Sequence, residues 1–374
     1  SSLGGDFIGK SFDYLLWYGR ERAKTKSHDL FSSRGIEDDV GGRYTRCELP
    51  GFFRRPMSKA EKSNPEALPQ GARVYRHDNL KSQSGSEAAE FPIAHQGMEF
   101  RPGKGFWKSN PTGIVRLDRA WRLAAPTPDS VNYVRFIDDF PFVGLSNVWG
   151  DTQTGAFTAS KDYVVQTNTK VLERCLLMTT DPGDLVLDPT CGSGTTAFVA
   201  EKWGRRWITC DTSRVAITLA KQRLMTASFD YYALRYPHEG LKGGFDYETV
   251  PHITLKSIAN NPDIDSIYDE VHPKIQASLV SLNSALTNAP VASFKPSQGV
   301  RKGQVVSFRN GGALQEWEVP FDWPETWPQT ARADFDAFHA ARQTKQRRID
   351  QSVADHAEPE TLYDKPRIDK NRLR

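Results

Sequence analysis

Short apolar runs that end in an acidic residue mark the middle of the chain. Leu185-Val-Leu187 is followed by Asp188, and Trp207-Ile-Thr-Cys210 is followed by Asp211. A short apolar run bounded by turn residues is typical of a strand buried in a parallel sheet. Between the two runs, Thr195–Trp203 has a helical pattern and stops at Gly204. The pattern therefore predicts a strand, a helix and a second strand.

Two glycines, Gly192 and Gly194, lie between the first predicted strand and the helix. A glycine turn lets the backbone approach a ligand where a Cβ atom would collide with it. The first N–H groups of the helix face the same crevice, and ligands of open α/β sheets bind at this carboxyl edge. We therefore expect a nucleotide-type ligand at residues 184–196.

The identity of that ligand depends on two carboxylates. Gly192-Ser-Gly-Thr-Thr-Ala197 also satisfies the loose G-x-G-x-x-A pattern of dinucleotide sites, so an NAD-dependent enzyme is one alternative. Asp188 disfavours a pyrophosphate but favours a ligand with a sulfonium and an ammonium group. Asp211 is placed to accept both hydroxyls of a ribose. An adenosine that carries positive charge suits both carboxylates.

The segment Asp188-Pro-Thr-Cys-Gly-Ser-Gly-Thr-Thr196 resembles the S-adenosylmethionine motif of DNA amino-methyltransferases, D-P-F-x-G-S-G-T-T, with Thr190 where phenylalanine is usual. Residues 163–170 are similar to the Y-P-T-Q-K-P element of the permuted, beta-type members. Residues 204–216 resemble their second strand and helix start. The resemblance covers residues 1–225 well and 250–366 loosely, and it indicates a Mod-like adenine methylase of the type III restriction-modification style.

The resemblance implies S-adenosylmethionine as the cofactor and a set of residues that bind it. These are Gln166, Thr167, Asn168, Asp188, Pro189, Thr190, Cys191, Gly192, Gly194, Thr195, Asp211 and Thr212. Gln166, Thr167 and Asn168 are expected to bracket the methionine end; alternatively, they only cap the helix that follows. Cys191 is interpreted as a small packing residue, because methyl transfer to an amine needs no thiol nucleophile.

The catalytic motif of the resembling family is missing from the chain. That motif is D/N/S-P-P-Y/F, which accepts the hydrogens of the target amine and stacks on the extruded base. No Pro-Pro pair occurs in the 374 residues, and Asn110-Pro-Thr-Gly113 and Asp139-Phe-Pro-Phe142 imitate the motif only imperfectly. Permuted members carry the catalytic motif first, so we hypothesise that this chain is an internal piece of a longer protein. Alone, it is expected to transfer no methyl group.

The net charge of +3 hides an uneven distribution. Between Arg43 and Arg135, 16 Lys or Arg residues face 9 Asp or Glu residues, a net charge of +7. Aromatic and cationic groups together suit the grip of phosphates and stacking on a displaced base, although a solvated, loop-rich surface is the alternative. In the resembling family this stretch is the target-recognition domain. Our candidates for contacts with duplex DNA are Arg54, Arg55, Arg73, Arg76, Lys104 and Lys108.

The predicted fold class is α/β. We expect a Rossmann-like methyltransferase sheet, partial in this chain, with an inserted irregular target-recognition domain and a C-terminal accessory region. The expected parts are an edge of the catalytic sheet (1–40), the target-recognition domain (41–145), the cofactor-binding part (146–232), and a linker with an accessory region (233–374). Asp13–Tyr18 is expected to form the edge strand, with Tyr14 and Trp17 in the core, and residues 331–355 a long helix.

Composition argues against several other classes. The cysteines Cys47, Cys175, Cys191 and Cys210 show no paired spacing, so neither a zinc site nor a disulfide framework is indicated. His252, His339 and His356 lack ligand-like neighbours in the sequence, and no metal is expected. No apolar run approaches the roughly 18 residues of a membrane span. The bacterial cytoplasm, in association with the nucleoid, is the simplest expected location.

The implied activity of the whole protein is methylation of adenine N6 in duplex DNA by base flipping, within a restriction-modification or defence system. A restriction subunit with helicase or nuclease activity and a second copy of the chain are the implied protein partners. Cytosine N4 is the alternative acceptor, because both amines suit the same motif. A non-catalytic DNA-binding subunit that retains the cofactor fold is the remaining alternative.

Overall fold

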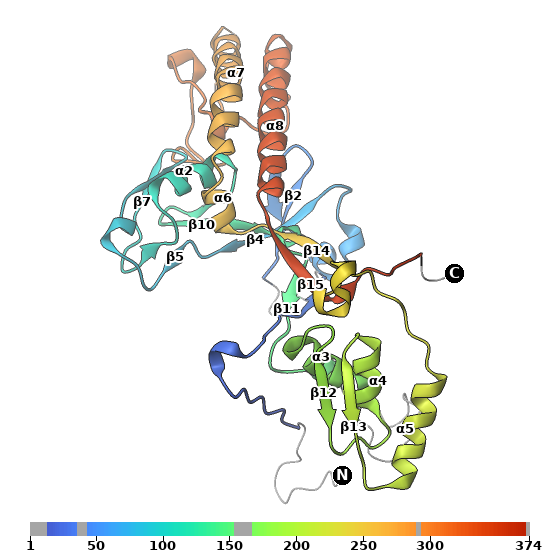
Figure 1. Ribbon diagram of the computed structural model, residues 1–374. Helices are drawn as coiled ribbons and strands as arrows, with labels where there is room; N and C mark the ends of the chain where they lie inside the picture. Colours follow the sequence, from blue (N-terminus) through green and yellow to red (C-terminus); the bar gives the residue numbers. More distant parts are fainter. Residues whose placement is uncertain (1–12, 36–42, 153–166, 289–292, 372–374) are drawn as a thin grey trace, which may run out of the picture. The chain divides into compact units, whose positions relative to one another are not determined.

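The computed structural model of the chain divides into two compact units (Figure 1). The residues that it describes are 13–35, 43–152, 167–288 and 293–371. Unit 1 comprises residues 1–32, 144–248 and 361–374, and unit 2 comprises residues 33–143 and 249–360. The chain passes from one unit to the other in or beside four strands: β1 (Phe31–Ser33), β11 (Phe142–Gly144), β14 (Tyr247–His252) and β15 (Glu358–Pro366).

Unit 1 contains the predicted strand, helix and strand. β12 (Leu185–Asp188) and β13 (Arg206–Thr209) are parallel, and α4 (Thr195–Lys202) connects them. The helix begins where the sequence predicts it, and Gly204 follows it with a φ of 69°. α3 (Thr169–Thr179) precedes β12 and α5 (Arg214–Thr226) follows β13. This mixed α/β arrangement agrees with the expected fold class.

The core of unit 1 lies on one face of this short sheet. Val186 and Trp207, which alternate with exposed neighbours along the two strands, pack against a cluster that contains Leu176 of α3 and Val199 of α4. Val199 is fully buried. Since successive side chains of a strand point to opposite faces, only one face of the sheet is covered by these helices.

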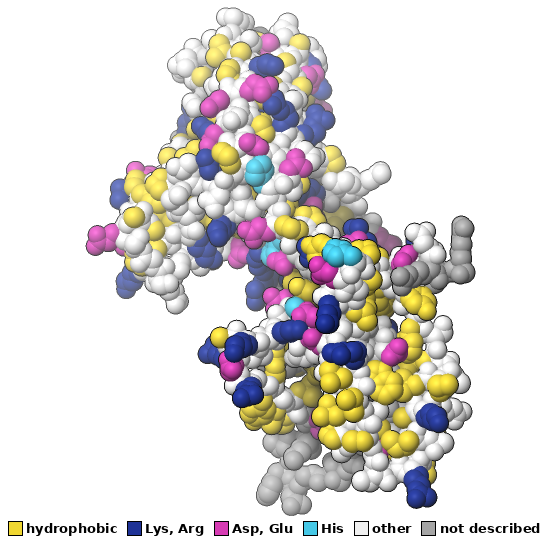
Figure 2. All heavy atoms as spheres, in the orientation of Figure 1, with side chains coloured by type: hydrophobic (Ala, Val, Ile, Leu, Met, Phe, Trp, Pro, Cys, Tyr) yellow, Lys and Arg dark blue, Asp and Glu magenta, His cyan; other side chains and the backbone are white. Residues whose placement is uncertain are grey.

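The opposite face of the sheet carries exposed apolar side chains. Leu185, Leu187 and Ile208 are 53%, 65% and 54% exposed. Figure 2 shows hydrophobic side chains gathered over β12 and β13. Parallel strands are normally covered on both faces. Among the residues that the structure describes, none buries these three side chains.

The expected edge strand at Asp13–Tyr18 is wrong. These residues form no regular element, and the side chains of Tyr14 and Trp17, predicted for the core, are 88% and 50% exposed. The β-type composition is present, but a strand also needs a hydrogen-bonded neighbour. No strand in the described part of the chain pairs with this segment.

Unit 2 is built on a five-stranded sheet with the strand order β3-β2-β4-β10-β9. Its strands are β2 (Arg46–Leu49), β3 (Phe53–Pro56), β4 (Arg73–Asp78), β9 (Leu123–Thr127) and β10 (Ser130–Phe136). All neighbours in this sheet run antiparallel. We expected residues 41–145 to be irregular, and that is wrong for these strands. The alternation of apolar and polar residues that predicts a strand is weak here, because arginines of β2, β3 and β4 occupy half-buried positions of the sheet.

The rest of unit 2 consists of short strands and helices around this sheet. They are α1 (Lys59–Ser63), β5 (Lys81–Ser82), β6 (Ile93–His95), β7 (Met98–Phe100), β8 (Phe106–Trp107), α2 (Pro111–Arg119), α6 (Leu255–Ala259), α7 (Asp263–Thr287) and α8 (Arg332–Asp355). The long helices α7 and α8 lie side by side (Figure 1). α8 confirms the helix predicted over 331–355.

α8 contributes to the two largest hydrophobic clusters of unit 2. Phe335 and Phe338 pack with residues of α7 and with Trp327, whereas Ile349 and Val353 pack in the cluster that contains Leu117 of α2. Residues 249–360, expected as part of an accessory region, therefore share a core with residues 33–143. The link joins segments more than 200 positions apart, which no local pattern reveals.

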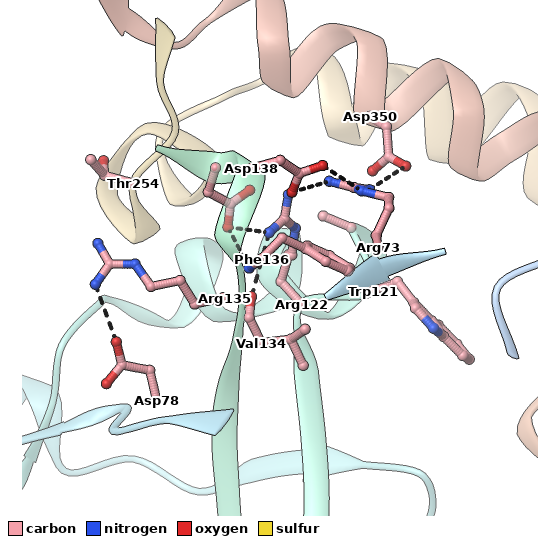
Figure 3. Close-up of polar contacts among 12 residues, drawn as sticks. Arg73, Asp78, Trp121, Arg122, Val134, Arg135, Phe136, Asp138, Thr254 and Asp350 are labelled. Carbon is pink, nitrogen blue, oxygen red and sulfur yellow. Dashed lines mark hydrogen bonds and ion pairs between the residues drawn. The ribbon is translucent and has the colours of Figure 1, made fainter. Parts of the chain in front are cut away.

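An ion pair is buried beneath the end of β10 (Figure 3). Arg122 Nη1 lies 2.7 Å from Asp139 Oδ2, and the two side chains are 2% and 1% exposed. Arg122 also donates to the Val134 carbonyl, and Asp139 accepts from the Phe136 amide. Although burial opposes the charged guanidinium, the Asp139 carboxylate raises the pKa of Arg122. Arg122 therefore keeps its positive charge inside unit 2.

Replacing one member of this pair is expected to destabilise unit 2 strongly. Asp139→Ala leaves the Arg122 guanidinium buried without a counter-ion, and we expect a loss of about 3–5 kcal/mol in the free energy of unfolding. The neighbouring Asp138 pairs with Arg73 at the surface, with side chains 51% and 31% exposed. Asp138→Ala is the matched control and should cost less than about 1 kcal/mol. Equal costs in urea unfolding would contradict this account.

Candidate functional site

The carboxyl ends of β12 and β13 bring Asp188 and Asp211 to one edge of the sheet. Asp188 is in register with Thr209, and the pairing continues past the strands. The Cys210 amide donates to the Asp188 carbonyl, and the Cys191 amide donates to the Cys210 carbonyl, each at 3.0 Å. The glycine turn after β12 therefore lies against the segment after β13, as the strand order predicts.

Asp211 ties these two segments together. Its Oδ2 accepts from the Gly192 amide at 2.9 Å and its Oδ1 accepts from the Ser213 amide at 2.8 Å. The backbone bond from Ser213, followed by the bond from Gly192, lowers the pKa of Asp211. The carboxylate is therefore ionised at neutral pH and acts only as an acceptor. Each of its two oxygens accepts an amide hydrogen from the backbone.

The two glycines of the turn have separate structural requirements. Gly192 has a φ of 51°, and Gly194 has a φ of 76° in the left-handed region, where it caps α4. A Cβ atom on Gly194 would lie 2.7 Å from Cβ of Ala220 in α5. The sequence predicted close approach to a ligand; the structure adds close approach of α5 as a reason for Gly194.

Other predicted cofactor residues cluster around this turn. Asp188 Oδ1 accepts from the Thr190 amide at 3.0 Å, and its second oxygen has no hydrogen-bond partner in the described part of the chain. Cys191 and Thr195 are 7% and 5% exposed, so they contribute more to packing than to an open surface. Thr195 Oγ1 accepts from Arg223 at 3.0 Å. Sequence reasoning missed Arg223, which lies on α5, 28 positions away.

The remaining members of the predicted set lie before α3. Asn168 caps this helix: its Oδ1 accepts from the Lys170 amide at 2.9 Å, and its Nδ2 donates to the Thr152 carbonyl at 3.0 Å. The capping alternative thus describes Asn168 in this structure. Gln166 lies outside the described residues. The roles of Gln166, Thr167 and Asn168 toward a cofactor, like those of Pro189 and Thr212, stay predictions.

The chemistry of this edge fits an adenosine-containing sulfonium cofactor. Asp211 supplies an ionised acceptor of the kind that ribose hydroxyls need. Asp188 has a carboxylate oxygen to spare on the strand next to it. The turn between them has positive φ at both glycines, so no Cβ atom fills the approach to the backbone.

The two imitations of the missing catalytic motif have structural roles. Asn110 caps α2 by accepting from the Gly113 amide at 2.7 Å, with Pro111 in the first turn. Asp139 is the buried partner of Arg122. Each carboxylate or amide is committed to its own fold, which supports the expectation that neither motif is catalytic.

All four arginines predicted to contact DNA are paired with carboxylates of unit 2. Arg54 pairs with Glu48 at 2.7 Å and donates to the Trp121 carbonyl. Arg55 makes two bonds to Glu61, of 2.6 and 2.8 Å, which lower the pKa of Glu61 to about 2. The carboxylate neutralises the charge of the paired guanidinium, so the pair attracts a phosphate less strongly than an unpaired arginine does. As DNA contacts these arginines stay predictions.

Of the other four candidates, the two arginines are paired with carboxylates and the two lysines are not. Arg73 pairs with Asp138 and Asp350 (Figure 3), and Arg76 pairs with Asp78. Lys108 donates only to the Asn79 carbonyl, and Lys104 is an exposed residue of the turn before β8 with no carboxylate partner in the described part of the chain. The two lysines are therefore the candidates with uncompensated charge.

The described ranges contain neither a metal-binding cluster nor a membrane-crossing helix. No group of three or more His, Cys, Asp or Glu side chains there is placed to hold a metal ion. None of the helices there combines the length and hydrophobicity that a membrane crossing requires.

Comparison with known proteins shows the family of the chain. A family model described as "DNA methylase" matches residues 5–222, more than half of the sequence. The match includes both carboxylates and the glycine turn. The chain belongs to this family of DNA methylases.

Relatives are similar over shorter stretches. The Type II methyltransferase M.BamHI of Bacillus amyloliquefaciens is 39% identical over 89 residues, 24% of this chain and 21% of that protein. The Type II methyltransferase M2.DpnII of Streptococcus pneumoniae is 38% identical over 85 residues, 21% of this chain and 30% of the relative. A Haemophilus influenzae protein named "Probable type III restriction-modification enzyme HindVI Mod subunit" is 38% identical over 84 residues, 21% of this chain and 11% of that protein. The chain thus spans less than a third of the length of these relatives.

Gly194→Ala should destabilise unit 1 by more than its backbone conformation alone requires. Gly311 has the same φ of 76°, but a Cβ atom there would have nothing within 4 Å. We expect about 1–2 kcal/mol for Gly311→Ala from the left-handed backbone, and at least a further ~1 kcal/mol for Gly194→Ala from the overlap with Ala220. Chemical unfolding of both variants measures the difference. Equal losses would show that α5 adapts without cost.

Proposed function

We propose that unit 1 binds S-adenosylmethionine as the cofactor-binding half of a DNA methyltransferase of the restriction-modification type. The observation that carries this proposal is the arrangement of Asp188, Asp211 and the Gly192 turn at one sheet edge. Asp211 is the acceptor for the ribose hydroxyls, and Asp188 faces the positively charged part of the ligand. The family match over residues 5–222 supports methylation of DNA as the reaction class.

S-adenosylmethionine, when bound, supplies an electrophilic methyl group on its sulfonium. The residues of this chain bind and orient the cofactor, and its sequence contains no D-P-P-Y-type motif to accept the hydrogens of the target amine. The reaction gains its rate from placing an amine nitrogen in line with the methyl group, and orientation of this kind lowers barriers substantially. Cys191, with its buried side chain, takes no part as a nucleophile.

The catalytic half is proposed to come from a D-P-P-Y-type motif elsewhere in a longer polypeptide. Two observations support this proposal: no Pro-Pro pair occurs in the chain, and the Leu185, Leu187 and Ile208 side chains leave one sheet face exposed. The finer identity that we propose is a permuted, Mod-like enzyme that methylates adenine N6 after base flipping. Cytosine N4 is the alternative acceptor, and a restriction subunit is the proposed partner.

Unit 2 is proposed to grip the DNA backbone. Lys104 and Lys108, near β8, have no carboxylate partner among the described residues. Contacts between such lysines and phosphates supply most of the sequence-independent affinity for DNA. We place the first contacts at Lys104 and Lys108 rather than at the paired arginines of β3 and β4.

Asp211→Ala is expected to weaken binding of S-adenosylmethionine by about 10- to 100-fold, or 1–3 kcal/mol, because charge-assisted bonds to the ribose are lost. Isothermal titration calorimetry measures the change. Asp246→Ala, which removes an exposed carboxylate paired with Arg367, is the control in the same unit and should bind normally. Unchanged affinity of the Asp211 variant would move the cofactor site elsewhere.

A double variant, Lys104→Ala with Lys108→Ala, should reduce the slope of log affinity against log salt by about 2 in duplex DNA binding, since each lost phosphate contact removes about 0.9. Lys59→Ala with Lys62→Ala makes the same change in net charge on the exposed surface of α1. If both pairs alter the slope equally, the effect is one of net charge, and the contacts lie elsewhere.

A further inference from the structure

A cavity of about 330 Å³ lies entirely within unit 2, between the β2–β3 turn, the loop at residues 321–323 and one face of α8. Phe335, His339 and Gln343 line it from α8, at intervals of four residues, so they share a face of the helix. Its volume falls within the roughly 300–1,000 Å³ of small-molecule sites. It contains neither the carboxylates Asp188 and Asp211 of the proposed cofactor site nor the lysines proposed to contact DNA.

Aromatic rings form the walls of this cavity. The ring centroids of Phe53 and Phe321 lie 5.2 Å apart, and those of Trp323 and Phe335 also lie 5.2 Å apart. Phe52, in the turn beside Phe53, has a φ of 72°, which a non-glycine residue seldom adopts. Walls of this kind favour a flat ring, which stacks on them or meets them edge to face.

His339 presents a hydrogen-bond acceptor to this space. Its Nε2 lies 2.9 Å from the Pro320 carbonyl, which only accepts, so Nε2 carries the hydrogen. Burial and the positive charge of Arg342 lower the pKa of His339 to about 4, so the ring is neutral at pH 7. Its Nδ1 then has a lone pair, and no partner for this atom is recorded in the described part of the chain.

Two further polar groups in the lining are unused. Gln343 is half-buried, and Asp322 is exposed; neither side chain has a hydrogen-bond partner within the described residues. Asp336, by contrast, is held by Arg332 at 2.9 and 3.0 Å. Arg332, which also lines the cavity, is bonded to Asp336 through its Nε. Beside it, Asp322 and His339 Nδ1 offer acceptors, and the Gln343 amide offers both a donor and an acceptor.

We propose that this cavity binds a planar heteroaromatic ring with an exocyclic amine, of the aminopyrimidine or aminopurine kind found in nucleobases. The aromatic walls hold the ring. Gln343 offers the paired donor and acceptor that recognise an amine next to a ring nitrogen. His339 Nδ1 and Asp322 favour the amine over a carbonyl oxygen in its place. The proposal goes beyond methyl transfer and does not depend on it.

Cytidine and uridine test this recognition directly. Cytidine has an amine on the ring beside an unprotonated ring nitrogen, whereas uridine has a carbonyl there beside a ring N–H group. We expect the 374-residue chain to bind cytidine at least about tenfold more tightly than uridine in calorimetry or saturation-transfer NMR. Gln343→Leu, a substitution of similar size and helix propensity, should lower cytidine affinity about tenfold. Gln351→Leu is the matched control, on an exposed position of α8, and should bind cytidine normally.

Short single-stranded oligomers of dC and dT distinguish the two sources of such a ring. If the dC oligomer binds, the dT oligomer does not, and the Gln343→Leu variant loses this binding, the cavity accepts a base of a nucleic acid. If free cytidine binds at least as tightly as the dC oligomer, the cavity accepts a nucleoside or nucleotide. Absence of saturable binding of both ligands would overturn the proposal, as would equal binding of cytidine by Gln343→Leu and the unaltered chain. S-adenosylmethionine binding, measured in parallel, reports on the cofactor site separately.

Discussion

The Asp211 carboxylate is the constraint on which the cofactor edge depends. One side chain accepts the Gly192 amide from the turn after β12 and the Ser213 amide before α5. Without it, the turn and the segment after β13 would keep the backbone bonds through Cys191 and Cys210 and the bond from Cys210 Sγ to the Pro189 carbonyl. The same bonds lower the pKa of Asp211, so the residue that holds the turn is also an ionised acceptor, the group that we propose for the ribose hydroxyls.

In unit 2, by contrast, most of the arginines discussed above form ion pairs that stabilise the fold. Arg122 and Asp139 are buried together, while Arg54, Arg55 and Arg73 each hold a carboxylate. A basic stretch of sequence is therefore not by itself a basic surface. The positive groups that remain available to bind a polyanion are residues such as Lys104, which lies on an exposed turn.

Local signals in the sequence predicted local structure well. The apolar runs at 185–187 and 207–210 became β12 and β13, the helix at Thr195 began as expected, and the spacing over 331–355 matched α8. Prediction failed where the outcome depends on distant residues. The β-type segment at 13–18 has no strand partner in the described part of the chain, and Arg73 pairs with Asp138, 65 positions away, and with Asp350. The candidate site was foreseeable in its carboxylates and glycines, whereas the close approach of Ala220 to Gly194 was not.

Amide hydrogen exchange with and without S-adenosylmethionine tests the central claim most directly, because it locates the ligand without requiring turnover. We expect slower exchange at residues 188–195 and 209–213, and no comparable effect of NAD. Unchanged exchange in these two segments at saturating S-adenosylmethionine, or equal protection by NAD, would contradict it.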